Sequence, residues 1–201
     1  MTFLVPLELS IIKREYFNGW YSIKAYYAAF ILSDFPTQTL CTTIYVVITY
    51  YLTNQPPEMF RFMMFLVVCL MAAFNAQGLG LMVGSIFNLK MGSILGSFFV
   101  IPFLIYSGFF VKMSEVNYCL HWLFDISFFK YALDGAMHSI YGFDRPKLDC
   151  KADYCHFVYP TKFMTFIEMP SCSYQKALFG LFIFIVVFRL FAFCIIKCRL
   201  K

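Results

Sequence analysis

The sequence predicts an all-α polytopic membrane protein with four transmembrane helices, an amphipathic cytosolic helix and a long outer loop with a re-entrant helical hairpin. Two observations lead to this fold class. Residues 62–89 contain no charged side chain, which is about eight residues more than a membrane-spanning helix needs. Hydrophobic residues make up 61% of the 201-residue chain and charged residues only 13%, so a soluble domain could not bury its apolar surface.

Each predicted span is a long apolar run. The four runs are residues 25–52, 62–89, 91–111 and 177–196. The last run holds a single charged residue, Arg189. In the first run Asp34 stands ahead of Pro36, and we expect this carboxylate to lie near the cytosolic interface and to cap the deeper part of the helix. A proton-relay role is the less favoured interpretation.

The second run carries a cluster of small and amide residues. Asn75 and Gln77 precede Gly80 and Gly84, which have the G-x-x-x-G spacing. Small residues let helices approach closely, and amides form hydrogen bonds between helices. The pattern predicts close packing within one subunit, with a dimer seam as the alternative.

Lysine and arginine collect beside three segments that share one side of the membrane if there are four spans. They are Lys13, Arg14, Lys24, Lys90, Lys197, Arg199 and Lys201. Such residues mark the cytosolic side, so both termini are predicted to be cytosolic and residues 112–176 to lie outside. Residues 6–22 mix charged with apolar side chains, which is typical of an amphipathic helix along the membrane surface.

The long outer loop contains its own helical pattern. Trp122, Ile126 and either Phe129 or Leu133 share one face at helical spacing. The pattern predicts an interfacial or re-entrant hairpin between the third and fourth spans.

Three cysteines lie in this outer loop, where disulfides persist. Cys150 and Cys155 are close in sequence, and a disulfide between them is favoured over a metal site that would include His156. Cys172 is either free or bridged to a second subunit, and both alternatives stay open.

The sequence has no phosphate-binding loop, H-E-x-x-H motif, G-x-S-x-G motif or dinucleotide fingerprint. All three histidines fall in the outer loop and no paired acids lie in the spans, which disfavours an intramembrane enzyme. We therefore expect no catalytic residue, no metal site and no cofactor on this chain.

Five strings occur in order along the chain. They are P-L-E-L-x-x-x-K-R-E-Y-x-N-G-W-Y-S-x-K-A-Y-Y from Pro6, S-D-F-P-x-Q from Ser33, I-Y-S-G-F-F-V from Ile105, S-I-Y-G from Ser139 and C-x-x-x-x-C-H-F from Cys150. In these strings the chain resembles a subfamily-G ABC half-transporter, and specifically the C-terminal part of its ABC-2 type transmembrane domain. The last two strings are most similar to the sterol- and lipid-exporting branch.

The resemblance implies that residues 1–201 are a partial transmembrane domain. A half-transporter of this family has a nucleotide-binding domain followed by six spans, so that domain, its ATP and Mg, and the first two spans would be missing here. The implied function is the membrane part of an ATP-driven exporter of sterols or other lipids at the plasma membrane, working as a homo- or heterodimer. The alternative is a non-transporting scaffold or regulatory fragment.

The resemblance also implies roles for individual residues. Arg14 and Glu15 would lie on a coupling helix, residues 6–22, that contacts the nucleotide-binding domain. The positions that match the substrate cavity are Ile101, Leu104 and Ile105. Phe109 and Phe110 match a hydrophobic gate between the cavity and the exit.

Overall fold

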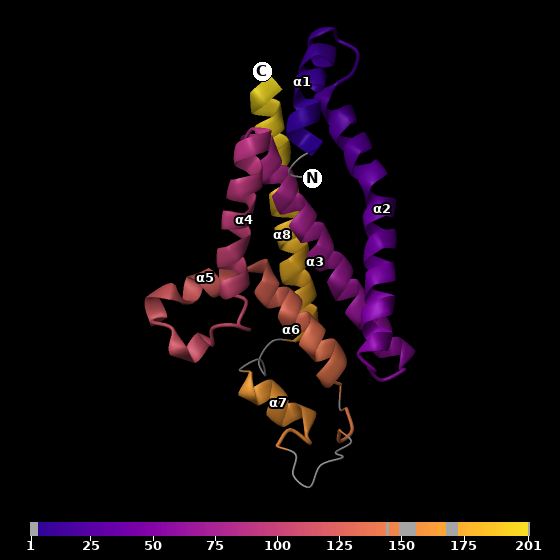
Figure 1. The fold of residues 1–201 in the computed structure, drawn as a ribbon, viewed down its shortest axis with the longest axis vertical. Helices are drawn as coiled ribbons and strands as arrows, with labels where there is room; N and C mark the ends of the chain where they lie inside the picture. The colour runs from indigo at the N-terminus through magenta and orange to yellow at the C-terminus, as the bar shows by residue number, and fades with distance from the viewer. Residues whose placement is uncertain (1–3, 144, 149–155, 168–172, 201) are drawn as a thin grey trace.

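A computed structural model describes residues 4–143, 145–148, 156–167 and 173–200 (Figure 1). Within these ranges the regular structure is entirely helical. The helices are α1 (Leu4–Phe17), α2 (Ile23–Leu52), α3 (Met59–Ile86), α4 (Leu89–Ile105), α5 (His121–Ile126), α6 (Phe128–Tyr141), α7 (Pro160–Phe166) and α8 (Tyr174–Leu200). Two short 3₁₀ turns, η1 (Met113–Glu115) and η2 (Tyr118–Leu120), precede α5.

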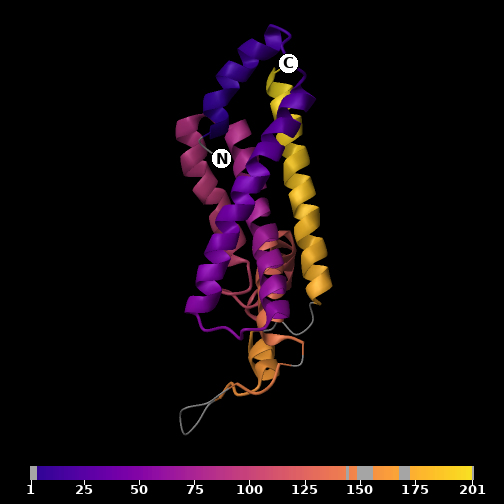
Figure 2. The same cartoon turned by 90° about the vertical axis from the view of Figure 1, so that its right-hand side faces the viewer.

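The four long helices run side by side and alternate in direction along the chain. Helix α2 descends in Figure 1, α3 ascends, α4 descends and α8 ascends, so α1 and the end of α8 share one end of the molecule. The short helices α5 and α7 lie toward the opposite end (Figure 2). Two helices in the described part of the chain, α3 and α8, are long and apolar enough to cross a membrane. Both helices therefore have the length and composition of membrane spans.

Helix α2 begins two residues before the predicted span and continues unbroken through its polar segment. The Ser22 hydroxyl accepts a hydrogen bond from the Ala25 amide at 3.3 Å, which satisfies one of the free N–H groups of the first turn. The helix runs through Pro36 to Leu52. Asp34 lies within this helix, eleven residues after its start, so the prediction that it caps a deeper segment was wrong.

Helix α4 is shorter than the predicted span, which extended to residue 111. It ends at Ile105, three residues beyond Pro102, which lies inside the helix. Gly108 then adopts φ +89°, a left-handed conformation that glycine accepts without steric cost and that no continuing α-helix contains. The chain therefore leaves the helix before the two phenylalanines at 109 and 110.

Helix α3 forms the centre of the bundle and contacts α8, α6, α2 and α4. The Asn75 side chain donates to the Leu181 carbonyl of α8 at 3.0 Å, and Gly84 is buried inside the chain. Packing within one subunit, as the small and amide residues predicted, is confirmed at these positions. Helix α6 approaches α8 at a glycine, because a Cβ on Gly180 would lie 2.6 Å from the Tyr131 ring.

The predicted apolar face of the outer loop does not run on as one helical face. Trp122 and Ile126 are exposed, whereas Phe124 and Phe128 are each only 1% exposed. The reason is a break at Ser127, which separates α5 from α6 and donates its hydroxyl to the Phe103 carbonyl of α4 at 2.5 Å. Since the break changes the helical phase, one face does not continue from residue 122 to residue 133.

Candidate functional site

The outward face of α4 carries the predicted pathway residues. Ile101, Leu104 and Ile105 are 51%, 40% and 39% exposed in the single chain. Ile94 and Phe98 extend the same face by one and two helical turns, and both are exposed. We call these five residues the α4 stripe. Since it is apolar along its whole length and unpaired within the described chain, it offers a surface for lipid or a second subunit.

The opposite face of α4 holds the helix against the bundle. Gly92 and Gly96 are buried, and Val100 and Phe103 pack against the core formed by α3, α6 and α8. Spacings of four, four and three residues keep these positions on one side of the helix. The orientation of the stripe is therefore fixed by packing, and the predicted pathway residues share one surface.

The predicted gate residues follow directly beyond the helix. Phe109 and Phe110 are 64% and 63% exposed, and their rings contact each other edge to face at 5.2 Å between centroids. The Ser107 hydroxyl accepts the Phe109 amide at 3.4 Å, which stabilises the turn at Gly108. The two rings have little packing within their own subunit, so their apolar surface remains available to another group.

Three helices meet in a polar network inside the bundle. The Arg189 guanidinium on α8 donates to the Gln77 side-chain oxygen on α3 at 2.7 Å, and the Gln77 amide donates to the Asp34 carboxylate on α2. The Tyr27 hydroxyl donates to the Arg189 carbonyl at 2.7 Å. A carboxylate and a guanidinium inside a membrane domain are costly alone, and here a neutral amide links them.

Sequence analysis did not connect these residues, although it noted Asp34, Gln77 and Arg189 separately. The sequence did contain a signal for this network. A charged side chain in a membrane span is unfavourable in lipid, so opposite charges on two spans favour pairing with each other. The hydrogen bond from Gln77 explains how Asp34 is accommodated in the interior of α2. One guanidinium nitrogen of Arg189, Nη1, is buried and has no hydrogen-bond partner among the described residues.

The predicted coupling residues lie on α1, which the structure places against the start of α2 (Figure 1). Glu15 accepts a hydrogen bond from the Tyr21 hydroxyl at 2.6 Å, and Glu8 accepts one from Tyr26 at 2.9 Å. Burial and the hydrogen bond to Glu15 raise the pKa of Tyr21 to about 12, so its hydroxyl keeps its proton at neutral pH. Arg14 is exposed. Two carboxylate–tyrosine bonds thus join α1 to the segment that follows it.

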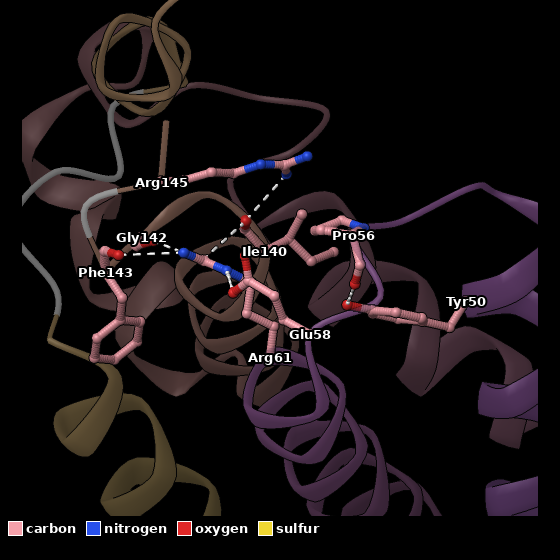
Figure 3. A network of polar contacts seen from close by, with 8 residues as sticks. All are labelled: Tyr50, Pro56, Glu58, Arg61, Ile140, Gly142, Phe143 and Arg145. Atoms are coloured by element: carbon pink, nitrogen blue, oxygen red, sulfur yellow. Dashed lines mark hydrogen bonds and ion pairs between the residues drawn. The ribbon is translucent and has the colours of Figure 1, made fainter. Parts of the chain in front are cut away.

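A second polar network lies at the start of α3. Sequence analysis gave its central residue, Arg61, no role. Arg61 is only 4% exposed and pairs with Glu58 at 2.6 Å. Its guanidinium also donates to the carbonyls of Ile140, Gly142 and Phe143 at 3.3, 2.8 and 3.2 Å, as Figure 3 shows. Arg61 therefore fixes the C-terminal end of α6 to the start of α3.

The predicted disulfide of Cys150 with Cys155 and the proposed alternatives for Cys172 lie outside the described residues. They stay predictions.

Comparison with known proteins identifies the family. Residues 1–141 match the ABC-2 type transporter family. "ABC transporter G family member 21" of Arabidopsis thaliana is 31% identical over 64% of the chain, and "ABC transporter G family member 1" of Dictyostelium discoideum is 24% identical over 96%. "Broad substrate specificity ATP-binding cassette transporter ABCG2" of Bos taurus is 25% identical over 68%.

The matched regions cover 19%, 26% and 21% of these three relatives, so the chain corresponds to about a quarter or less of each protein. The family match and the relatives agree with the apolar helical bundle described above. The chain therefore belongs to the ABC-2 type transporter family, as a transmembrane domain of the subfamily-G type.

Proposed function

We propose that these residues form part of the membrane pathway of an ATP-driven exporter of sterols or other lipids at the plasma membrane. ATP hydrolysis would come from a nucleotide-binding domain outside the 201 residues. The observation that supports this proposal best is the α4 stripe, a continuous apolar surface that ends at the exposed pair Phe109 and Phe110. A sterol or acyl chain needs an apolar wall with few polar groups, which this surface provides.

The proposal includes four membrane crossings, by α2, α3, α4 and α8. Their alternating directions support it, and so does the link from Gln77 to Asp34, which lowers the cost of the carboxylate in α2. Helix α4 has 17 residues and a length of about 25 Å, and the chain beyond Ile105 would complete its crossing. Helices α5 and α6 would then re-enter the outer part of the membrane, since α6 packs against α3 and α8.

The orientation follows from charge. The end of the molecule that holds α1 and the end of α8 also carries most of the lysine and arginine beside the long helices, including Lys13, Lys24 and Arg199. The positive-inside rule assigns this end to the cytosol. There α1, with Arg14 and Glu15, would receive the motion of the nucleotide-binding domain.

A second half-transporter is part of the proposal. In a twofold dimer each subunit presents the same surface to its partner, so two α4 stripes would face each other across the pathway. The two phenylalanine pairs would meet beyond them and close the exit without charge. The sequence admits either a homodimer or a heterodimer.

Lipid efflux from proteoliposomes tests this function. The full-length protein, reconstituted at known orientation, is loaded with radiolabelled cholesterol or phosphatidylcholine, and an amphipathic drug is included because one relative is named for broad substrate specificity. We expect ATP-dependent export of at least one lipid. Ile101→Trp should reduce that export about tenfold by narrowing the pathway, because a bulky ring occupies the stripe.

Leu190→Trp is the matched control, since Leu190 is an exposed aliphatic residue on α8 and lies outside the stripe. Its export should equal that of the unmodified protein. Absence of ATP-dependent export for both lipids would contradict the lipid assignment, and export of the drug alone would move the proposal to a different substrate class. Equal loss in both variants would remove the role of the stripe.

A further inference from the structure

We propose that the outer end of the molecule contains a binding pocket for a small amphipathic anion, with a ring or short apolar body and one carboxylate, sulfate or sulfonate group. The pocket is a cavity of about 500 Å³ between the C-terminal end of α6 and helix α7. Cavities of this volume hold small organic ligands. It lies at the end of the bundle opposite α1 and apart from the α4 stripe (Figure 1).

Aromatic side chains supply the apolar walls. Tyr141 and Phe143 line the cavity from the end of α6, and Tyr159 lines it from the residue before α7. Met164 adds a buried aliphatic surface. Rings on several sides favour a flat or compact apolar body, because aromatic faces stack on such groups.

One cationic side chain lines the pocket, and two more lie near its Tyr159 wall. Arg145 lines the cavity, with its guanidinium 5.3 Å from the Tyr141 ring. The ammonium groups of Lys147 and Lys162 lie outside the lining, 5.1 and 5.6 Å from the Tyr159 ring. Arg145 donates one hydrogen bond to the Ile140 carbonyl at 3.1 Å. A guanidinium group has five N–H donors in all. The described lining residues include no Asp or Glu. The charge of the pocket therefore complements an anion.

One lining side chain has an unused hydrogen-bonding atom. Nε2 of His138 is buried and has no partner within the described part of the chain. A buried polar atom without a partner costs free energy, and such atoms are uncommon in folded proteins. Because Nε2 has almost no accessible surface, it becomes available to an anionic oxygen only when the His138 ring turns toward the cavity.

The structure also holds part of this pocket in place before any ligand arrives. Gly142 and Phe143 line the cavity, and their carbonyls are the groups that Arg61 binds from α3 (Figure 3). A preformed wall lowers the entropic cost of binding. One wall of the pocket is thus tied to a long helix of the bundle, and the pocket is separate from the proposed transport pathway.

Binding of naphthalene-2-sulfonate to the full-length protein in phosphatidylcholine nanodiscs tests the proposal. Isothermal titration measures its affinity, and naphthalene-2-methanol supplies the same rings without the charge. We expect the sulfonate to bind at least about tenfold more tightly than the alcohol, because a charge-assisted hydrogen bond to Arg145 is lost with the neutral probe. Empty nanodiscs give the background from lipid.

Two variants alter the pocket in different ways. Arg145→Gln removes the charge and should weaken sulfonate binding about tenfold. Thr161→Tyr fills the cavity from α7 while every cation remains, and it should abolish binding of both probes. Lys130→Gln is the matched control, because Lys130 lies at the other end of α6, paired with Asp125 at 2.8 Å, and its removal should change nothing.

Equal affinity for the two probes would overturn the proposal, and so would sulfonate binding that survives in Thr161→Tyr. Thr161→Tyr keeps the result decisive if Arg145→Gln fails to fold, since Thr161 is exposed and its replacement removes no buried contact. The readout is binding and not transport, so it stands or falls independently of the lipid-export proposal.

Discussion

Arg61 shows how a single residue can define the end of an element far away in sequence. The last turn of an α-helix leaves carbonyl groups without intrahelical partners, and a cation is favourable there. Arg61 supplies both bonds and charge to the end of α6, some eighty residues later in the chain. Phe143, which follows, has φ +55°, an unusual conformation that these bonds help to maintain.

Replacing Arg61 by Met should lower the free energy of unfolding by about 3 kcal/mol, because buried carbonyls and Glu58 lose their partner. Thermal unfolding of the protein in lipid nanodiscs measures this change. Lys147→Met, a cation of the same outer region with an exposed side chain, should leave the unfolding temperature nearly unchanged. Similar effects of the two substitutions would mean that Arg61 contributes no more than a surface charge.

The network of Asp34, Gln77 and Arg189 predicts coupling between two residues that are not bonded directly. Asp34→Leu or Arg189→Leu alone leaves one charge in the bundle without its counterpart, whereas the double replacement removes both charges. A double-mutant cycle should therefore give a favourable interaction energy of about 1 kcal/mol between positions 34 and 189. Unfolding in mixed micelles provides the four values. Strict additivity would show that the link through Gln77 carries no electrostatic interaction.

At the scale of elements, the two faces of helix α4 differ: one packs against the bundle and the other is exposed. Its inner face holds it to α3, while its stripe and the pair that follows remain exposed. Phe109→Ala with Phe110→Ala should therefore lower the stability of the subunit by less than about 1 kcal/mol, because neither ring is buried in it. The same replacement should open a leak of small solutes through the reconstituted full-length dimer if the rings close the exit.

Phe128→Ala is the informative comparison for that double variant. Phe128 is 1% exposed, and its loss should lower the unfolding free energy by about 3 to 5 kcal/mol. Unfolding and dye-release measurements on the same preparations separate the two effects. A large destabilisation by the double variant, or a normal barrier in the dimer, would contradict the gate.

The helices themselves were largely predictable from the sequence, since apolar runs longer than a span leave few alternatives. The starts of α2, α3, α4 and α8 lie within three residues of the predicted spans. The premature end of α4 depends on the backbone of Gly108, and the inward faces of α5 and α6 depend on the break at Ser127. Neither follows from periodicity, because each is a local departure from the repeat that periodicity assumes.

The sites were less predictable for the same physical reason. Three residues of the α4 stripe, Ile101, Leu104 and Ile105, were named through the family resemblance, and the structure adds Ile94 and Phe98 on the same face of the helix. The bonds from Arg61 to α6 and from Gln77 to both Asp34 and Arg189 join segments more than forty residues apart. Such contacts depend on how helices are placed relative to one another, which no local pattern records.

At the scale of the whole molecule, the two ends of the bundle differ in charge and in composition. Helix α3 carries Arg61 near its start, where it bonds the end of α6, and Gln77 deeper in the bundle, so a movement of this helix would reach both networks. The end with α1 is basic, and the opposite end holds the aromatic pocket. In the proposed function, the basic end would receive the motion of the nucleotide-binding domain and the opposite end would release the substrate.

Site-specific photocrosslinking tests the central claim that lipid passes along the α4 stripe. A benzophenone amino acid is placed at Ile101, or at Leu190 on α8 as a control, in the full-length protein reconstituted with radiolabelled cholesterol. We predict that trapping the protein with ATP and vanadate lowers cholesterol labelling at position 101 severalfold and leaves labelling at position 190 unchanged. Labelling that is equal at the two positions and insensitive to nucleotide would contradict the claim.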